Sequence, residues 1–461
     1  MPNKKFNGLK SSNKTESKTS LDTNSTFDSY SGGEESNLIK KKHGMSTLVA
    51  ILFIAGENAG CGVLALPFSF DRTGWSGLPL LLMCWLDAGI CGILIGKCWL
   101  ILEERWPKFR QSCRNPYAAI GQMAYGNKMK VIVSICLQVS LLGSAVVILL
   151  ICAELIAQFV DQYFHLPFAL WILIVSIVLL PFMMLGSPGE MWPVAAGALL
   201  TITTAIVLIM IDTSKDFIEA DGKPAPTTPP TVSSVSLAFG TFIFAFGGTA
   251  VFPNYQNDMK NKSKFPKAVI IGYIMLIVLY IPIAVMGYLT YGSSVKNNII
   301  SSIPNGVKKD AAILLLSGHL FFAFLIVANG AILEIEHQLK VPNRFGWKRL
   351  IVRTITLIVV VFISETIPKF GKILDLMGGS AITMLAYILP PLFYMKLCSM
   401  RDDNNSWPVW KVSLIEKIYY YKITIVGTIG GISCTFWALK AILAPDAFSL
   451  PCYIDFNCSN E

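Results

Sequence analysis

The sequence contains few charged residues. Asp, Glu, Lys and Arg make up 15% of its 461 residues, whereas soluble globular proteins hold about 25%. Hydrophobic residues make up 53%, which excludes an ordinary soluble protein. The sequence also lacks a cluster with metal-ligand spacing, a nucleophile spaced to meet a base, and a phosphate-binding loop. These absences argue against an enzyme, and they imply no metal and no cofactor.

The apolar residues fall in blocks of about 20, the length that a helix needs to cross the core of a bilayer. These blocks predict an all-α polytopic membrane protein with eleven transmembrane helices. The predicted spans are 46–70, 76–101, 131–160, 168–186, 190–211, 235–256, 267–291, 311–336, 350–366, 372–395 and 419–443. No apolar stretch lies near the start of the chain, so we expect the first span to act as its own insertion signal.

The net charge of +9 is explained by membrane topology. When the loops are assigned to alternate sides, 28 Lys and Arg residues lie on the side of the N-terminal tail and 9 on the opposite side. This excess places the N-terminus in the cytosol, because cytosolic loops are enriched in Lys and Arg. An odd number of spans then places the C-terminus outside the cell or in a lumen. No nucleic-acid partner is implied.

The two ends of the chain differ from the membrane domain, residues 45–444. Residues 1–44 hold twelve Ser or Thr within the first 36 positions and few large apolar groups, which predicts a disordered cytosolic tail. Residues 445–461 form a short non-cytosolic tail that contains Cys452 and Cys458. The sequence leaves open whether these two cysteines form a disulfide or remain free thiols.

The N-terminal tail contains the motif EESNLI. It fits the acidic di-leucine pattern that sorting adaptors bind in endosomal and lysosomal traffic, with Glu34, Leu38 and Ile39 as the positions concerned. The motif favours an endosomal, lysosomal or vesicular membrane, and the plasma membrane stays an equal alternative.

Two of the predicted spans are interrupted by glycine and proline. The span 46–70 contains GENAGCG followed by Pro67, and the span 235–256 contains FGG followed by Pro253. Unwound backbone is tolerated at membrane depth only where it lines a polar cavity. Matching interruptions in two halves therefore point to the central binding site of a transporter. The alternative is that the glycines only allow helices to pack closely.

The two interruptions occupy matching positions of two halves. Spans one to five cover residues 46–211, and spans six to ten cover residues 235–395. Because five is an odd number, the second half lies upside down relative to the first. We therefore expect a 5+5 inverted repeat with one extra helix at residues 419–443.

The backbone groups freed by the first interruption suit the carboxylate of a zwitterionic amino acid. The N–H groups of Cys61, Gly62 and Val63 begin a half-helix, where N–H groups and the helix dipole favour an anion. Gly60 and Gly62 leave room for the backbone to approach this group.

The second interruption suits the ammonium group of the same ligand. The carbonyls of Phe246 and Gly247 are the candidate acceptors, at the end of a half-helix. Gly248 continues the break, and Thr249 adds a hydroxyl group. The aromatic rings of Phe244 and Phe246 either shape a side-chain pocket or serve in ordinary packing.

Glu57 falls near the middle of its predicted span, where a charged carboxylate is costly and marks a functional-site hypothesis. It is the first candidate for proton coupling, and a purely structural carboxyl group is the alternative. Asp87, in the next span, is the second candidate, with a helix-packing hydrogen bond as its alternative. Asn58 is expected to hydrogen-bond the unwound segment, with coordination of a cation as the alternative. His319 is expected to make an ordinary polar contact.

The phrases NAGCGVLALPFSF in the first span, VFPNYQNDMK in the sixth, and Met377–Gly379 followed by ILPPLFYM in the tenth resemble the amino acid/auxin permease family. The resemblance covers about residues 45–444. It implies the inverted-repeat fold of the bacterial leucine transporter and secondary active transport of amino acids, often coupled to protons and in some branches to sodium. Many relatives carry His where this chain has Thr249, so no role of that histidine carries over.

The sequence therefore predicts a secondary active transporter of small or neutral amino acids that works by alternating access around its broken helices. Protons are favoured over sodium, because the cytosolic half of the eighth span, FLIVANGAILEIEH, has no Ser or Thr to bind sodium. Two alternatives stay open: a transport-inactive amino-acid sensor, and a vesicular or lysosomal exporter of the same fold. An ion channel is not supported, since no polar residues recur across several helices.

Overall fold

The computed structural model describes residues 44–110, 113–184, 192–341, 346–402, 407–444 and 452–454. These residues belong to one unit of the chain, Gly44–Glu461. Their secondary structure is helical, and the single β contact among them is an isolated bridge between Met45 and Met259.

The described α-helices are α2 (Thr47–Asn58), α3 (Leu66–Thr73), α4 (Gly77–Arg105), α5 (Pro116–Tyr125), α6 (Asn127–Val160), α7 (Phe168–Met183), α8 (Trp192–Glu219), α9 (Val232–Ala245), α10 (Phe252–Asp258), α11 (Phe265–Tyr291), α12 (Val307–Gln338), α13 (Trp347–Thr366), α14 (Phe370–Met377), α15 (Leu389–Ser399) and α16 (Leu414–Leu443). Short 3₁₀ helices lie between them: η1 (Cys61–Ala65), η2 (Gly74–Ser76), η3 (Pro107–Arg110), η4 (Gly248–Ala250), η5 (Lys262–Lys264), η6 (Gly292–Ser294) and η7 (Ile299–Ser302). The π-helical segments η8 (Gly378–Ile382) and η9 (Met384–Ile388) connect α14 to α15.

Side-chain caps set the start of three helices. The hydroxyl of Ser46 accepts the N–H of Val49 at the start of α2. Thr231 caps α9 through a capping box, and Ser413 caps α16 in the same way with Glu416. These caps satisfy N–H groups that have no partner inside the helix.

Seven helical runs in the described residues are long and apolar enough to cross a membrane, rather than the eleven that the sequence predicts. They are Cys61–Arg105, Asn127–Val160, Ala196–Glu219, Lys262–Ser294, Val307–Gln338, Phe370–Ser399 and Leu414–Leu443. Three shorter apolar helices, α2, α7 and α9, accompany them. The numbers differ partly because the interruptions leave α2 with 12 residues and α9 with 14. In addition, the run Cys61–Arg105 joins α3 and α4, although Gly74 turns the chain between them with a φ of 58°.

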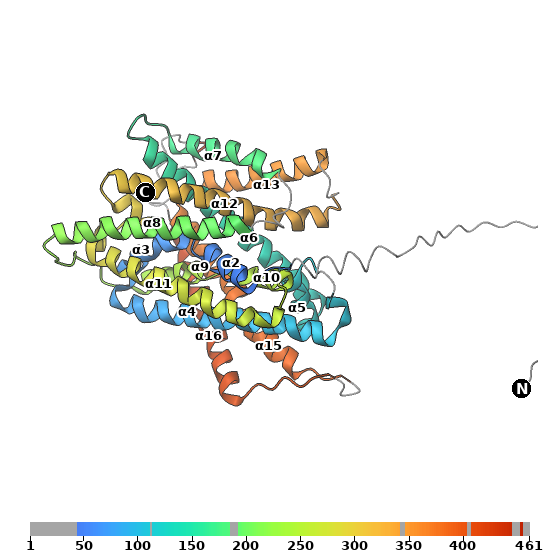
Figure 1. The fold of residues 1–461 in the computed structure, drawn as a ribbon. Helices are drawn as coiled ribbons and strands as arrows, with labels where there is room; N and C mark the ends of the chain where they lie inside the picture. The colour runs from blue at the N-terminus through green and yellow to red at the C-terminus, as the bar shows by residue number, and fades with distance from the viewer. Residues whose placement is uncertain are drawn as a thin grey trace, which may run out of the picture. The chain divides into compact units, whose positions relative to one another are not determined.

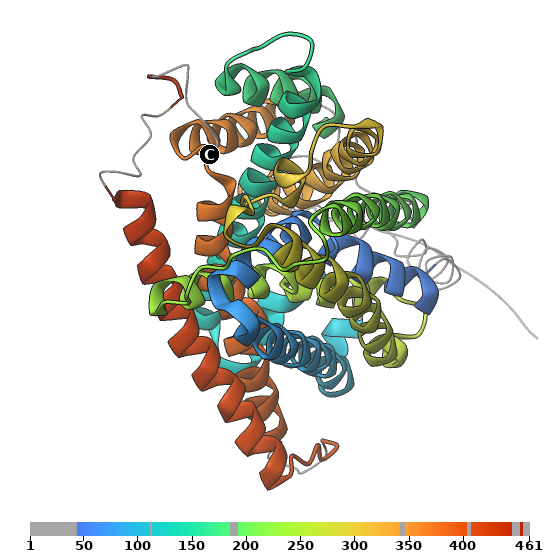
Figure 2. The same ribbon diagram turned by 90° about the vertical axis from the view of Figure 1, so that its left-hand side faces the viewer.

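The long helices α4, α8, α11 and α12 run roughly parallel to one another (Figure 1). The short helices α2 and α9 lie among them: α2 packs against α8 and α11, and α9 packs against α3, α14 and α16. Figure 2 shows α16, in red, along one edge of the bundle. The interrupted helices are therefore central, and the extra helix predicted at the end of the sequence is peripheral.

Large apolar side chains are exposed on several outer helices. Examples are Ile177 on α7, Val278 on α11, Ile358 on α13 and Ile429 on α16, each at least 60% exposed. Extended apolar surface of this kind marks contact with a membrane or a partner. Together with the long apolar helices, it describes a multi-pass membrane protein.

Backbone hydrogen bonds tie the segment before α2 to the segment after α10. The N–H of Met45 donates to the carbonyl of Asp258 at 2.8 Å, and the N–H of Lys260 donates to the carbonyl of Met45 at 3.0 Å. Gly44 permits this approach, because a Cβ there would lie 3.0 Å from the backbone nitrogen of Lys260. The first residues of the membrane domain are thereby attached to the second interrupted span.

Some predicted features lie outside the described residues. They are the tail with its sorting motif at Glu34, Leu38 and Ile39, and Cys458. Cys452 is disulfide-bonded, and its N–H donates to the carbonyl of Glu365 at 2.8 Å. The sequence left open whether Cys452 pairs with Cys458, and Cys458 lies outside the described residues.

Candidate functional site

The two interrupted spans break in the same way. α2 ends at Asn58, and η1 follows before α3 begins with Pro67 in its first turn. α9 ends at Ala245, and η4 follows before α10 begins with Pro253 in its first turn. Proline is favoured at the start of a helix, where its missing N–H would have no intrahelical partner. Each break therefore consists of a helix end, a 3₁₀ turn and a new helix.

The side chain of Asn58 joins the two breaks. Its Oδ1 accepts the backbone N–H of Gly248 at 2.9 Å, and its Nδ2 donates to the carbonyl of Ile54 at 2.7 Å. Asn58 is buried, and its bond to Ile54 is buried as well, whereas its bond to Gly248 is part-buried. The expectation that Asn58 bonds an unwound segment is confirmed, and the segment is that of the other broken helix.

Two tyrosines of α11 satisfy carbonyls that the breaks release. The hydroxyl of Tyr280 lies 2.5 Å from the carbonyl oxygen of Asn58 and 3.0 Å from that of Ala245, the last residues of α2 and α9. The hydroxyl of Tyr273 donates to the carbonyl of Phe246 at 2.9 Å. Carbonyls at a helix C-terminus lack intrahelical partners, and an unpaired one is costly at membrane depth. The tyrosines therefore stabilise both breaks from one helix.

Two glycines let the breaks touch. A Cβ added at Gly62 would lie 2.8 Å from the Cα of Ala245, and one at Gly248 would lie 2.6 Å from the Nδ2 of Asn58. Both distances are well inside the separation of about 3.5–4.0 Å at which non-bonded carbon atoms attract each other best. A larger residue at either position would push the two broken helices apart.

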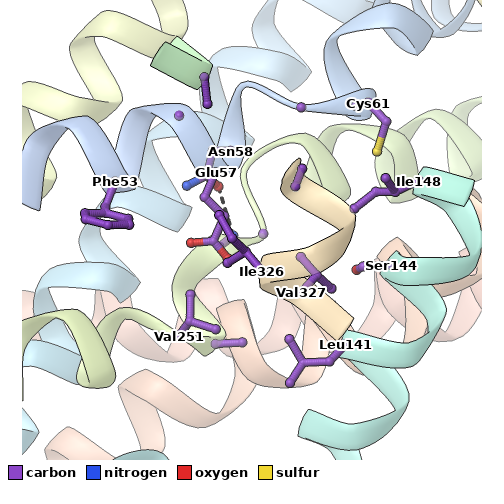
Figure 3. A pocket seen from close by; sticks show the side chains of 18 of the residues that line it. Phe53, Glu57, Asn58, Cys61, Leu141, Ser144, Ile148, Val251, Ile326 and Val327 are labelled. Atoms are coloured by element: carbon purple, nitrogen blue, oxygen red, sulfur yellow. Dashed lines mark hydrogen bonds between the residues drawn. The ribbon is translucent and has the colours of Figure 1, made fainter. Parts of the chain in front are cut away.

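A cavity of about 110 Å³ lies beside the two breaks and is completed by α6, α8 and α12 (Figure 3). A single water needs about 10–15 Å³, and drug-sized sites occupy about 300–1,000 Å³. The cavity therefore has room for a small solute. Six of the residues predicted for the site line it: Glu57, Gly60, Cys61, Gly62, Gly247 and Gly248.

Three other predicted residues, Val63, Phe246 and Thr249, are fully buried beside the breaks and do not line the cavity. The ring of Phe246 packs against the rings of Tyr273 and Tyr280, with centroid distances of 6.1 and 5.2 Å. Its side chain therefore belongs to the packing around α11, whereas Phe244 lines the cavity.

Asp87 also does not line the cavity, and it joins α4 to α16. Its carboxylate lies 2.7 Å from the Nζ of Lys422 and accepts the hydroxyl of Tyr419 at 2.6 Å. Asp87 is fully buried, whereas the side chain of Lys422 is 38% exposed. An ion pair and a hydrogen bond thus hold this acid between two helices.

Glu57 bonds across the two interrupted spans. Its Oε2 accepts the hydroxyl of Tyr255, from α10, at 2.5 Å. Both residues line the cavity, and Figure 3 shows Glu57 beside Asn58 at the end of α2. Among the described residues of the lining, Glu57 is the only acid; it is linked to the second broken helix and lies against the space that a solute would fill.

Four polar residues that were not predicted for the site also line the cavity: Ser140, Ser144, Tyr255 and His319, of which His319 was expected to make only an ordinary polar contact. Ser140 and Ser144 are four residues apart on α6, so they lie on one face of that helix. That spacing was the signal by which the sequence could have indicated these two residues. It is a weak signal, because serines in a long apolar span are common. The contribution of α6 and α12 to the cavity depends on tertiary packing.

The fold resembles that of solved membrane transporters. MhsT, crystallised in complex with L-phenylalanine, superposes with a TM-score of 0.55 and 11% identity, over 85% of this chain and 98% of its own. A manganese transporter of Eremococcus coleocola gives a TM-score of 0.50 and 14% identity, over 92% of each chain. At such low identity these likenesses establish the fold only.

Curated proteins with similar sequences share one description. The amino acid transporter AVT1C of Arabidopsis thaliana is 23% identical over 83% of this chain and 68% of its own length. AVT1J of the same plant is 25% identical, over 84% of this chain and 89% of its own length. Vacuolar amino acid transporter 4 of Saccharomyces cerevisiae is 25% identical, over 82% of this chain and 56% of its own length.

Residues 43–433 match the family described as transmembrane amino acid transporter protein. The match includes both breaks and every residue that lines the cavity. It is a transporter family rather than an enzyme family, in agreement with the resemblance seen in the sequence motifs. This chain belongs to the transmembrane amino acid transporter protein family.

Proposed function

We propose that this protein is a secondary active transporter of small or neutral amino acids, which alternates access to a site beside its two broken helices. The observation that carries the proposal is the cavity itself, lined by Gly60, Cys61 and Gly62 from one break and by Gly247 and Gly248 from the other. Membership of an amino acid transporter family and the small size of the cavity support it.

In the proposed site, backbone groups bind the parts that all amino acids share. The N–H groups of Cys61 and Gly62 open η1 ahead of its first hydrogen bond, so they have no intrahelical acceptor. They would bind the carboxylate, whereas the N–H of Val63 donates to the carbonyl of Gly60 at 3.4 Å and Val63 does not line the cavity. The carbonyl of Gly247, which lines the cavity, would accept from the ammonium group; Phe246 does not line the cavity, and its carbonyl accepts from Tyr273. Gly248 and Thr249 would shape the turn that positions the Gly247 carbonyl.

The proposed architecture has eleven spans, with repeat one at 46–211, repeat two at 235–395 and an extra helix at 419–443. The matching order of helix end, 3₁₀ turn and proline-started helix in both breaks supports the inverted repeat. Residues 45–444 would form the transporter domain, between a cytosolic N-terminal tail and a non-cytosolic C-terminal tail.

Protons are the proposed coupling ion, with Glu57 as the group that binds them. A part-buried acid that lines the cavity and bonds Tyr255 on the other broken helix can connect protonation to the relative position of α2 and α10. Asp87 stays the second candidate for proton coupling. Because Asp87 already forms an ion pair with Lys422, Glu57 is preferred for this role. Sodium is the less favoured ion.

A vacuolar, lysosomal or other endomembrane location is proposed, with the plasma membrane as the alternative. One relative is named as a vacuolar transporter, and the sequence EESNLI, with Glu34, Leu38 and Ile39, would serve sorting adaptors. In such a membrane the protein would export amino acids to the cytosol. A transport-inactive sensor with the same site is the other alternative.

Reconstitution into liposomes tests the proposed function. Labelled neutral amino acids should enter liposomes that contain the full chain when a pH gradient is imposed, and a sodium gradient alone should drive little uptake. Binding of amino acids without any uptake would favour the sensor and contradict transport. Liposomes without protein supply the background for both measurements.

A further inference from the structure

His319 has one ring nitrogen occupied and one without a partner. Its Nδ1 lies 3.0 Å from the carbonyl oxygen of Ala198 on α8. Because a carbonyl can only accept, Nδ1 carries the hydrogen, and in the neutral ring Nε2 is left as an acceptor. Nε2 is buried and has no hydrogen-bond partner among the described residues. The ring is 2% exposed and lines the cavity.

A buried ring nitrogen without a partner is an exception, because buried polar groups nearly always form hydrogen bonds. The position of His319 in the lining gives the exception an explanation. A solute that fills the cavity and carries an N–H or O–H group would supply the missing donor. Ala198, which fixes the ring through Nδ1, also lines the cavity, so the ring orientation is set at the site.

The polar groups of the cavity are divided between its sides. The breaks supply backbone groups and Glu57, whereas α6 and α12 supply Ser140, Ser144 and His319. Figure 3 shows Ser144 on α6 and Glu57 on α2. The other residues that α6 and α12 contribute are apolar, such as Leu141 and Val327. If the breaks hold the carboxylate and ammonium groups, the substrate side chain meets the wall formed by α6 and α12.

We propose that His319 determines substrate specificity: its Nε2 accepts a hydrogen bond from the substrate side chain and selects small amino acids with a hydroxyl donor over aliphatic ones of equal size. This proposal rests on the proposed transport function and names its substrate class. Threonine and valine have almost the same shape and differ in that donor. A site built around a buried acceptor rejects the analogue without the donor far more strongly than an apolar pocket rejects an extra hydroxyl.

The test compares uptake of labelled threonine and valine by the full chain in liposomes. The wild type should prefer threonine by about 10-fold or more, as expected when a buried polar group loses its partner. His319→Phe keeps a ring and removes the acceptor, so its ratio should fall toward one. His319→Gln places an amide oxygen near the position of Nε2 and should keep part of the preference. His165, whose side chain is 88% exposed, supplies the control His165→Phe, which should keep the wild-type ratio.

Each outcome decides the proposal. Equal uptake of threonine and valine by the wild type overturns it, and so does an unchanged ratio in His319→Phe. If His319→Phe does not fold, the wild-type ratio and the His319→Gln ratio decide in its place. A protein that takes up no amino acid under any gradient contradicts the proposed function itself, whereas uptake without the threonine preference contradicts only the role of His319.

Discussion

The Oδ1 atom of Asn58 lies 2.9 Å from the backbone nitrogen of Gly248, so a single hydrogen bond connects the break after α2 with the break after α9. The two residues are 190 positions apart in the sequence. A bond between such distant residues forms only once both halves of the chain have packed together. Asn58 therefore belongs to the scaffold that holds the backbone groups around the cavity.

Replacing Asn58 should destabilise the protein. Asn58→Leu removes the acceptor of the Gly248 N–H and leaves that part-buried donor without its partner, which should lower the free energy of unfolding by about 1–3 kcal/mol. Asn58→Asp retains an acceptor for Gly248 but loses the amide donor to the Ile54 carbonyl, so it should destabilise the protein as well. Thermal unfolding of the purified variants in detergent measures the difference. Equal stability of Asn58→Leu and the wild type would show that the bond contributes nothing.

The two glycines of the first break should respond differently to alanine. A Cβ at Gly62 would collide with the backbone of Ala245, whereas the nearest atom to one at Gly60 is the carbonyl oxygen of Glu57 at 3.5 Å, an ordinary contact. Gly62→Ala should therefore lower the unfolding temperature. Gly60→Ala should fold normally and reduce uptake, because its methyl group enters the cavity lining. Normal stability of Gly62→Ala would contradict the close approach of the two breaks.

Glu57→Gln tests proton coupling. The amide cannot bind and release a proton, so uptake driven by a pH gradient should fall to background while exchange of internal for external amino acid partly survives. Tyr255→Phe removes the hydroxyl that bonds Glu57 and should change the pH dependence of uptake without abolishing it. Unaltered pH dependence in Glu57→Gln would remove this residue as the coupling site.

Asp87 should act as a structural acid. Asp87→Asn leaves the ammonium group of Lys422 without its counter-ion, which should cost about 1–3 kcal/mol, less than for a fully buried pair because Lys422 is 38% exposed. The pH profile of uptake should not move. The double variant Asp87→Asn with Lys422→Met should recover part of the lost stability. A shifted pH profile in Asp87→Asn would instead assign it to coupling.

Local signals in the sequence located the breaks but not the groups that stabilise them. Gly60, Gly62 and Pro67 interrupt an apolar run, and the chain breaks there into a 3₁₀ turn between α2 and α3. Tyr280 reaches Asn58 across 222 positions, and nothing near Tyr280 in the sequence distinguishes it from an aromatic residue in contact with lipid. Only tertiary packing assigns its role.

The same reason explains what was missed in the cavity. His319 lies in an unbroken helix, α12, and its importance comes from Ala198 and from the shape of the space beside it. The number of membrane spans predicted from the sequence differs from the number of long apolar helices in the structure for a different reason. A composition rule registers an apolar block whether it forms one long helix or two short ones, so α2 and α9 count as spans in the sequence and as short helices in the structure.

Gly62 packs against Ala245 and Gly248 packs against Asn58, each in the other break. This close contact has an evolutionary consequence. In the proposed site the ligand is bound through main-chain atoms, so a change of side chain would weaken that binding only by blocking access to those atoms. Residues on the facing helices α6 and α12 are then free to vary, because they do not provide the shared grip. Gene duplicates could diverge toward different amino acids by changes in those two helices alone, while both glycines stay fixed under purifying selection.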